Sequence, residues 1–198
     1  MKKYFLLFGL LVIGQFCPAQ NTVVMFLDIQ GIDGEYIVPT RSTVTPIPLK
    51  TNNLLIDTYD FDWVKTTRMP NQINGNFVNG GVTEFGEMEV VFKLDKSVIG
   101  IFDKLVNNTK TAIVDLFIDK PANSLPTDQT ELQRIRMEQV TISSLSMINL
   151  EIPQYKMTLK FEKVSIIVHS FDGLGVATKG SSYGFNFLTG NSTGIYGF

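Results

Sequence analysis

The sequence predicts an all-β protein, a compact antiparallel β-barrel or sandwich with a single flanking α-helix at about residues 96–107. Runs in which apolar and polar residues alternate, typical of strands with one buried face, recur along most of the chain. Only one segment changes to the helical period. The chain has 198 residues, 44% hydrophobic and 18% charged, which is enough to build one globular core.

Residues 1–20 are predicted to be a signal peptide. A positively charged start precedes an apolar run of 11 residues, Tyr4–Gly14, and the small Ala19 follows. The run is too short to cross a bilayer, so cleavage after Ala19 or Gln20 is expected. Cleavage would remove two lysines and Cys17, which leaves no cysteine and 15 basic against 19 acidic residues, a net charge of −4. An N-terminal core segment and a lipid anchor on Cys17 are the alternatives.

The first half of the remaining chain predicts strands, a turn and loops. In order, these are a strand at Val23–Gln30, a turn at Gly31 to Gly34, a loop at Pro39–Pro48, a β-rich segment at Asn53–Val64 and a long polar loop at Lys65–Gly81. Prolines mark the first loop because they cannot donate to a central ladder, and Asp33-Gly34 is a turn signal. In the β-rich segment, Leu55, Tyr59, Phe61 and Trp63 share one parity and are expected on one face.

The predicted helix follows a strand at Glu84–Leu94, in which Met88, Val90, Phe92 and Leu94 share one side. The apolar residues of the helix then recur at the spacing of one helix face: Val98, Ile101, Phe102, Leu105 and Val106. Asp95 is expected to be its N-cap, because a carboxylate there accepts backbone N–H bonds. Asn107-Asn108 is expected to end it after about three turns.

The second half predicts further strands and a different tail. Thr111–Ile118 is a strand, a polar loop surrounds Pro121–Thr130, and two long strands at Gln133–Leu150 and Gln154–Val168 are separated by Pro153. After Ser170 the composition becomes rich in Gly, Ser and aromatic residues. We therefore expect a barrel domain at 21–170 and an extension at 171–198 outside the main fold, ending in a sticky Tyr196-Gly197-Phe198.

Composition and spacing argue against most kinds of catalytic site. The charge is nearly balanced, so a nucleic acid partner is not expected, and one His with one Cys cannot build a zinc site or a nucleophile dyad. Three acidic groups have residue types suited to calcium binding or acid–base chemistry, but their patterns favour strand faces, turns or isolated carboxylates: Asp57, Asp60 and Asp62; Asp28, Asp33 and Glu35; Glu151 and Glu162. His169 ends a strand without a partner in the sequence, and the sequons at Asn107 and Asn191 carry little weight. The sequence thus predicts no catalytic, cofactor-binding or metal-binding residues and no enzyme.

Five segments form an ordered set. They are Phe26–Glu35 (FLDIQGIDGE), Ile56–Trp63 (IDTYDFDW), Phe92–Ser97 (FKLDKS) before the helix, Val140–Ser144 (VTISS) and Tyr155–Val164 (YKMTLKFEKV). Over about residues 23–168 this set resembles the haemolysin-coregulated protein (Hcp) family, the tube protein of type VI secretion systems. The resemblance implies a small antiparallel barrel with one helix. It also implies a structural role, in which hexameric rings assembled head to tail stack into a tube that carries effectors.

Three hypotheses follow for function. The first is a non-enzymatic, ring-forming tube subunit that differs from the family in being exported, to the periplasm or the extracellular space. Its partners would be other copies of itself, effector cargo or components of a secretion system. The counterparts of the family's stacking loops would be Val38–Lys50 and Lys65–Gly81. The second hypothesis is a secreted monomeric binding module that presents its loops and tail to a surface ligand. An enzyme with paired carboxylates is a third and weaker possibility. Neither a cofactor nor a membrane span is expected.

Overall fold

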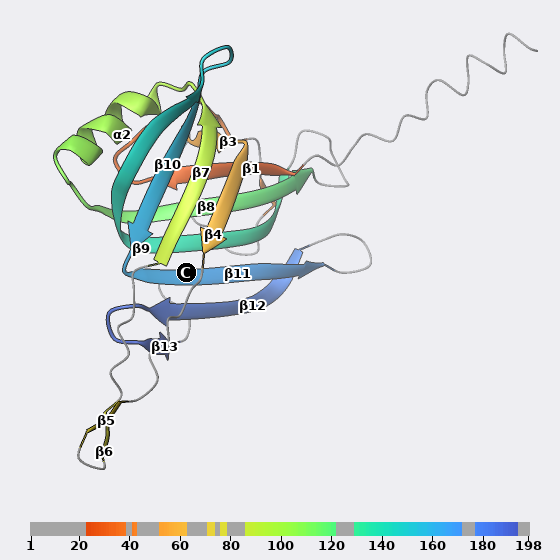
Figure 1. Cartoon of the computed structure of the whole chain (residues 1–198). Coiled ribbons are helices and arrows are strands. Elements are labelled where there is room, and N and C mark those ends of the chain that lie inside the picture. The colour runs from red at the N-terminus through yellow and green to blue at the C-terminus, as the bar shows by residue number, and fades with distance from the viewer. Residues whose placement is uncertain are drawn as a thin grey trace, which may run out of the picture.

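The computed structural model describes residues 23–38, 41–42, 52–62, 71–73, 76–78, 86–121, 129–171 and 177–193. Its elements are β1 (Val24–Ile29), β2 (Arg41–Ser42), β3 (Leu54–Ile56), β4 (Thr58–Asp62), β5 (Asn71–Ile73), β6 (Asn76–Val78), β7 (Gly86–Lys93), α2 (Ser97–Val106), β8 (Thr111–Pro121), β9 (Gln129–Asn149), β10 (Gln154–Phe161), β11 (Lys163–Phe171), β12 (Ala177–Asn186) and β13 (Asn191–Thr193). The all-β class with one helix is confirmed (Figure 1).

One long strand, β9, connects the two halves of the main sheet. Its first part pairs antiparallel with β8 and β11, and its second part pairs with β10. The strand order is β13-β12-β11-β9-β10-β7-β4, with β1 beside β8 and β3 beside β1. In Figure 1 the strands β10, β7 and β4 run steeply across β1, β8 and β11, so the sheet closes over a core between its two halves.

The segments in which apolar and polar residues alternate most regularly form strands, as predicted: β7 and β10. In β7 the side chains of Met88, Val90 and Phe92 are fully buried, and in β10 those of Met157 and Leu159 are too. Met88 lies opposite Leu159 in the antiparallel register, so the two apolar rows face the core together. The expectation for Leu94 is wrong, because its side chain is 60% exposed beyond the last residue of β7.

The helix lies where the periodicity predicts it, with its first residue at Ser97 and its last at Val106. The Asp95 carboxylate accepts the Ser97 N–H at 2.7 Å, as expected of a cap, although the residue at the N-cap position is Lys96. The buried face is narrower than predicted. Ile101 is fully buried, whereas Phe102 and Val106 are 57% and 64% exposed, because α2 contacts the barrel through one side only.

Two predicted strands are interrupted. The segment at Asn53–Val64 forms β3 and β4, separated at Asp57. The interruption changes the parity that faces the core, so Leu54 and Ile56 are buried and Leu55 is 43% exposed, contrary to expectation. The segment at Gln154–Val168 forms β10 and β11, which meet at a corner at Glu162. The corner carries the chain from one half of the sheet to the other.

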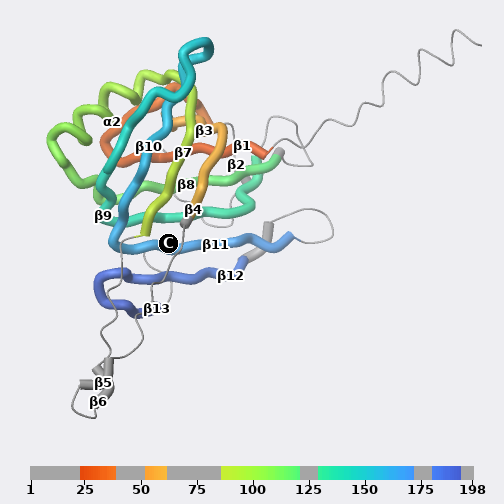
Figure 2. Tube along the Cα trace, in the orientation of Figure 1, coloured from red at the N-terminus to blue at the C-terminus, as the bar shows by residue number. Residues whose placement is uncertain are grey.

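The expectation that residues 171–198 lie outside the main fold is wrong for the described part of this segment. β12 pairs antiparallel with β11 from Lys163–Asn186 to Phe171–Ala177, and β13 extends the sheet by one further strand. Phe185 and Phe187 are buried at 6% and 4% exposure and belong to the core cluster. Phe185 and Phe187 therefore pack against the core, where the Phe187 ring meets Phe161, and β12 lies beside β11 (Figure 2).

Several expectations fall outside the described residues. These are the signal peptide at 1–20, most of the loop at Pro39–Pro48, the C-terminal Tyr196-Gly197-Phe198 and most of Lys65–Gly81. Within the last segment, β5 and β6 form a short antiparallel pair where only loop was expected (Figure 1). No helix in the described ranges is both long enough and apolar enough to cross a bilayer.

Candidate functional site

The outer surface of β4, β7 and β10 is a charged face. Lys156 and Lys160 on β10 pair with Glu89 and Glu87 on β7, with N–O distances of 2.8 and 2.7 Å. These four side chains are each about two fifths to one half exposed. On the other side of β7, the exposed Asp60 lies directly opposite Glu89. The face is therefore polar and salt-bridged on the outside while Met88 and Val90 fill the inside.

The strands that carry this charged face have two open edges in the described part of the chain. β4 pairs only with β7, and beyond Val140 the second part of β9 pairs only with β10. Because the order is β9-β10-β7-β4, these edges lie on opposite sides of the four strands. An open edge presents unpaired backbone N–H and C=O groups to a further strand. The arrangement can thus accept a neighbour on each side.

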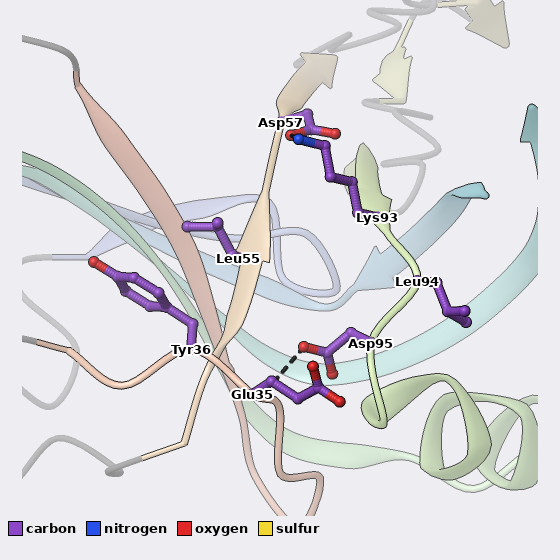
Figure 3. Close-up of a pocket in the computed structure, with 7 residues that line it drawn as sticks. All are labelled: Glu35, Tyr36, Leu55, Asp57, Lys93, Leu94 and Asp95. Atoms are coloured by element: carbon purple, nitrogen blue, oxygen red, sulfur yellow. Dashed lines mark hydrogen bonds and ion pairs between the residues drawn. The ribbon is translucent and has the colours of Figure 1, made fainter. Parts of the chain in front are cut away.

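A cleft of about 250 Å³ lies beside the start of α2 and is lined by Glu35, Tyr36, Leu55, Asp57, Lys93, Leu94 and Asp95 (Figure 3). Asp95 accepts the Glu35 N–H at 2.9 Å, and Glu35 accepts the Lys96 N–H at 3.2 Å. The two carboxylates thus join the β1–β3 connection to the first turn of the helix, where negative charge is favoured. Figure 3 shows Lys93 directed toward Asp57, at 3.8 Å.

The acidic group at Asp57, Asp60 and Asp62 is dispersed by the structure. Asp57 lies at the interruption between β3 and β4, where it also accepts the Gln154 side-chain N–H at 3.0 Å. Asp60 is on the exposed face of β4, as the alternation predicts, and the backbone of Asp62 pairs with Glu87. Across the described ranges, no group of three or more His, Cys, Asp or Glu side chains is placed to hold a metal ion.

The acidic residues near the first turn are separated as well. Asp28 is in β1, opposite Asp115 of β8. The predicted turn forms at Gly31, whose φ of +82° is one that glycine adopts without strain. Asp33 lies in the connection after this turn, and Glu35 reaches the cleft.

Two buried ion pairs were missed by the sequence analysis. Arg136 donates two hydrogen bonds to Asp115, each 2.8 Å long. These bonds raise the pKa of the Arg136 guanidinium above its ordinary value, although burial opposes the shift. Arg134 donates to both carboxylate oxygens of Glu131 at 3.1 and 2.7 Å, and its guanidinium lies 4.9 Å from the centre of the Phe117 ring.

His169 is connected to the second of these pairs. Its Nε2 lies 3.1 Å from Glu131 Oε1, and the two side chains are only 6% and 2% exposed. His169 therefore has a structural role, because its contact with Glu131 connects β11 to β9, whereas the sequence indicated only a His at the end of a strand. No local pattern in the sequence indicates the contact between Glu131 and Arg134, because an interval of three residues places them on opposite faces of a regular strand. The register of β9 with β8 shifts between Glu131 and Gln133.

The remaining acidic residues lie at ends and corners. Glu151 is exposed in the turn between β9 and β10. Glu162 forms an ion pair with Lys110 at 2.6 Å, and its backbone receives the Phe187 N–H. Of the two sequon residues, Asn107 ends α2 with its side chain bonded to Asp103 at 2.9 Å, and Asn191 begins β13. Glu162, like Glu35 and Asp57, thus joins separate elements of the fold.

Comparisons with known proteins place this geometry in a family. A sequence profile described as "Type VI secretion system effector, Hcp" matches residues 26–167. No protein of curated function matches the chain by sequence. The fold is similar to that of Hcp1 from Salmonella typhimurium, with a TM-score of 0.57, 15% identity and coverage of 86% of this chain and 99% of the other.

Two further solved structures have the same fold. A type six secretion system protein aligns with a TM-score of 0.65 at 13% identity, over 87% of this chain and all of the other (100%). A type VI secretion system effector from Yersinia pestis aligns with a TM-score of 0.54 at 12% identity, over 82% and 98%. At these identities the likeness shows the fold, and the profile match over most of the chain shows the relationship: the chain belongs to the Hcp family of type VI secretion proteins.

Proposed function

We propose that this chain is an exported, ring-forming tube subunit whose work is done by strand edges and surfaces rather than by catalytic groups. The observation that carries the proposal is the pair of open edges, β4 and the second part of β9, on opposite sides of one four-stranded unit. Two different edges on one molecule favour a head-to-tail contact, which closes into a ring when the rotation between neighbours allows it. A hexamer is the expected closed form, by resemblance to the family.

The charged face supports the same reading. Lys156, Lys160, Glu87 and Glu89 pair with one another across β7 and β10, so the face is hydrated without a large net charge. Such a surface suits the wall of a channel, because effector cargo can pass it without strong adhesion. Other copies of the chain, effector cargo and secretion-system components are the proposed partners.

Export is the part of the proposal that departs from a tube assembled in the cytoplasm. The charged start and the apolar run Tyr4–Gly14 are typical of a secretory signal. We infer cleavage near Ala19 and a location in the periplasm or outside the cell. Mass spectrometry of the N-terminus of the exported protein tests this inference. A first residue at Asn21 or Gln20 supports it, and an intact Met1 contradicts it.

The second candidate function is a monomeric binding module. The cleft beside α2 favours it, since a cleft of about 250 Å³ lined by Tyr36, Leu55 and Leu94 could receive a small surface ligand. Here the chain would remain a single barrel, and ligand would raise its thermal stability.

Light-scattering mass after size exclusion separates the two candidates. The chain from Asn21 is expected to elute with the mass of a hexamer, and negative-stain images of that peak should show annular particles. The same chain with Asp60→Pro is measured beside it. This variant places a proline in the open edge strand β4, where it hinders pairing with a neighbour. A monomer at high protein concentration in the unaltered chain would refute the ring and favour the binding module.

A further inference from the structure

One row of outward side chains crosses the four strands β9, β10, β7 and β4. Thr158 of β10 lies opposite Ser144 of β9 on one side and Glu89 of β7 on the other. Asp60 of β4 lies opposite Glu89 and ends the row. Figure 1 shows these strands side by side, with β9 and β4 at the two margins. The row therefore begins with a hydroxyl at one open edge and ends with a carboxylate at the other.

The β4 end of the row places one carboxylate beside another. Glu89 has its cation on the far side of β7, where Lys156 of β10 pairs with it at 2.8 Å. Among the described residues no ion pair involves Asp60, whose side chain is exposed. Like charges directly opposite each other on neighbouring strands destabilise a sheet. Asp60 therefore favours a hydrogen-bond donor on its open side and disfavours another acid there.

The β9 end of the row offers hydroxyl groups and no charge. Residues 139–150 contain no charged side chain. Ser144 and Ser146 are both exposed, and the Ser144 hydroxyl donates to Thr158 Oγ1 at 2.8 Å. Because each hydroxyl can both donate and accept, this bond can reverse, which frees Ser144 to donate across the open edge. The β9 edge thus offers the donor that suits Asp60 and presents no acid to it.

The directions of the two edge strands suit a contact between copies. β9 is antiparallel to β10, β10 to β7 and β7 to β4, so β9 and β4 run in opposite directions. The β4 strand of one copy can therefore continue the antiparallel pattern beside β9 of the next copy. Without a stagger between copies Asp60 faces Ser144, and a shift of two residues brings the hydroxyl of Ser146 instead. The Cβ atoms of residues opposite each other stand about 4.5–5.5 Å apart, which short side chains can span.

We propose that Asp60 sets the direction of assembly by accepting a hydrogen bond from the Ser144 hydroxyl of the neighbouring copy. The inference rests on the proposed ring, because it names the residues that select its edge-to-edge contact. A hydrogen bond to a carboxylate is stronger than one between neutral groups, so it favours β4 beside β9. A contact of β4 with β4 would bring two Asp60 carboxylates to one edge, with Glu89 one strand behind each. Such like-charge contacts suppress wrong pairings, so head-to-tail joining is favoured over the joining of two β4 edges.

Reversal of charge at the contact tests the proposal in the chain from Asn21. Ser144→Asp sets an acid against Asp60 of the next copy, and the protein concentration at half-assembly should rise at least about tenfold. Adding Asp60→Lys to Ser144→Asp sets a lysine against the new acid and should restore assembly. The matched control is Ser182→Asp, an exposed serine on β12 outside the four-stranded unit, which should leave assembly unchanged. Analytical ultracentrifugation measures assembly, and the Tm of each variant shows that it is folded.

The outcomes separate this inference from the proposed function. If the unaltered chain assembles and Ser144→Asp assembles as readily as Ser182→Asp, the two residues do not meet, so the inference is wrong and the ring proposal stands. A folded double variant that assembles no better than Ser144→Asp alone would also overturn the inference, because charge would not be the cause of the loss. If the unaltered chain is monomeric at every concentration, the ring proposal fails and this inference fails with it.

Discussion

Replacement of Phe187 by alanine tests whether the C-terminal strands belong to the core. The ring is 4% exposed and packs edge-on against Phe161 at 5.6 Å and against Phe185 at 5.0 Å between centroids. Removal of a buried Phe side chain costs about 3–5 kcal/mol, which includes the cavity left behind. We expect this loss in the free energy of unfolding. At about 2–4 °C per kcal/mol for a chain of this size, Tm should fall by about 6–20 °C.

Urea unfolding followed by far-UV circular dichroism measures the loss. The control is Leu188→Ala, one residue further along and 61% exposed, which should change the free energy of unfolding by no more than about 0.5 kcal/mol. A loss below about 1 kcal/mol for Phe187→Ala, with an unchanged m-value, would refute the assignment of β12 to the core. Two separate transitions would mean that β12 and β13 unfold before the rest of the barrel.

The remaining predictions concern the buried pair and the start of the helix. Asp115→Ala leaves the buried Arg136 without its two hydrogen bonds and should cost about 3–5 kcal/mol, whereas the double variant Asp115→Leu with Arg136→Met should recover most of that loss in urea unfolding. A double variant as unstable as the single one would contradict this account. Asp95→Ala removes the acceptor for two backbone N–H groups and should cost about 1–2 kcal/mol. Asp103→Ala, on the exposed side of the same helix, is its control and should cost less than half as much; equal losses would show that the Asp95 contacts contribute little.

The sequence predicts strands well where only one face is buried. In β10, Met157, Leu159 and Phe161 alternate with Lys160 and other polar residues, and the period-2 pattern gives both the strand and its orientation. The position of the helix was equally predictable, because only that segment showed apolar residues at the helical period. The width of its buried face could not be predicted, because periodicity does not show how much of an apolar helix face contacts the rest of the fold.

The position of the C-terminal segment was wrongly predicted because its composition obscured the alternation typical of a strand. Glycine and serine are common in loops, and they lowered the apparent strand signal of Ala177–Asn186. Yet Tyr183, Phe185 and Phe187 recur at every second residue, which is the period of a strand. Gly184 and Asn186 between them lie on the other face. At Gly180, where the register of β12 with β11 shifts beside Val168, a Cβ would collide with the Val168 carbonyl.

The burial of the charged residues of β9 could not be predicted from the pattern of that strand, for a different physical reason. Arg134 and Arg136 alternate with Ile135 and Met137, which predicts a polar face in water. Both arginines are buried, because each has an acidic partner, and a paired charge can be buried where a single one cannot. Asp115, the partner of Arg136, is 21 residues away on β8, and Glu131 stands three residues before Arg134, an interval that a regular strand assigns to opposite faces. Single-strand patterns do not show such partners.

The 21-residue strand β9 has a mechanical consequence. Its backbone runs without interruption from one half of the sheet into the other, so a load applied to either half is carried by covalent bonds. The two halves cannot slide past one another unless the ladders of β9 break together in shear. A subunit built in this way transmits a pull from one half of the sheet to the other through the backbone of β9.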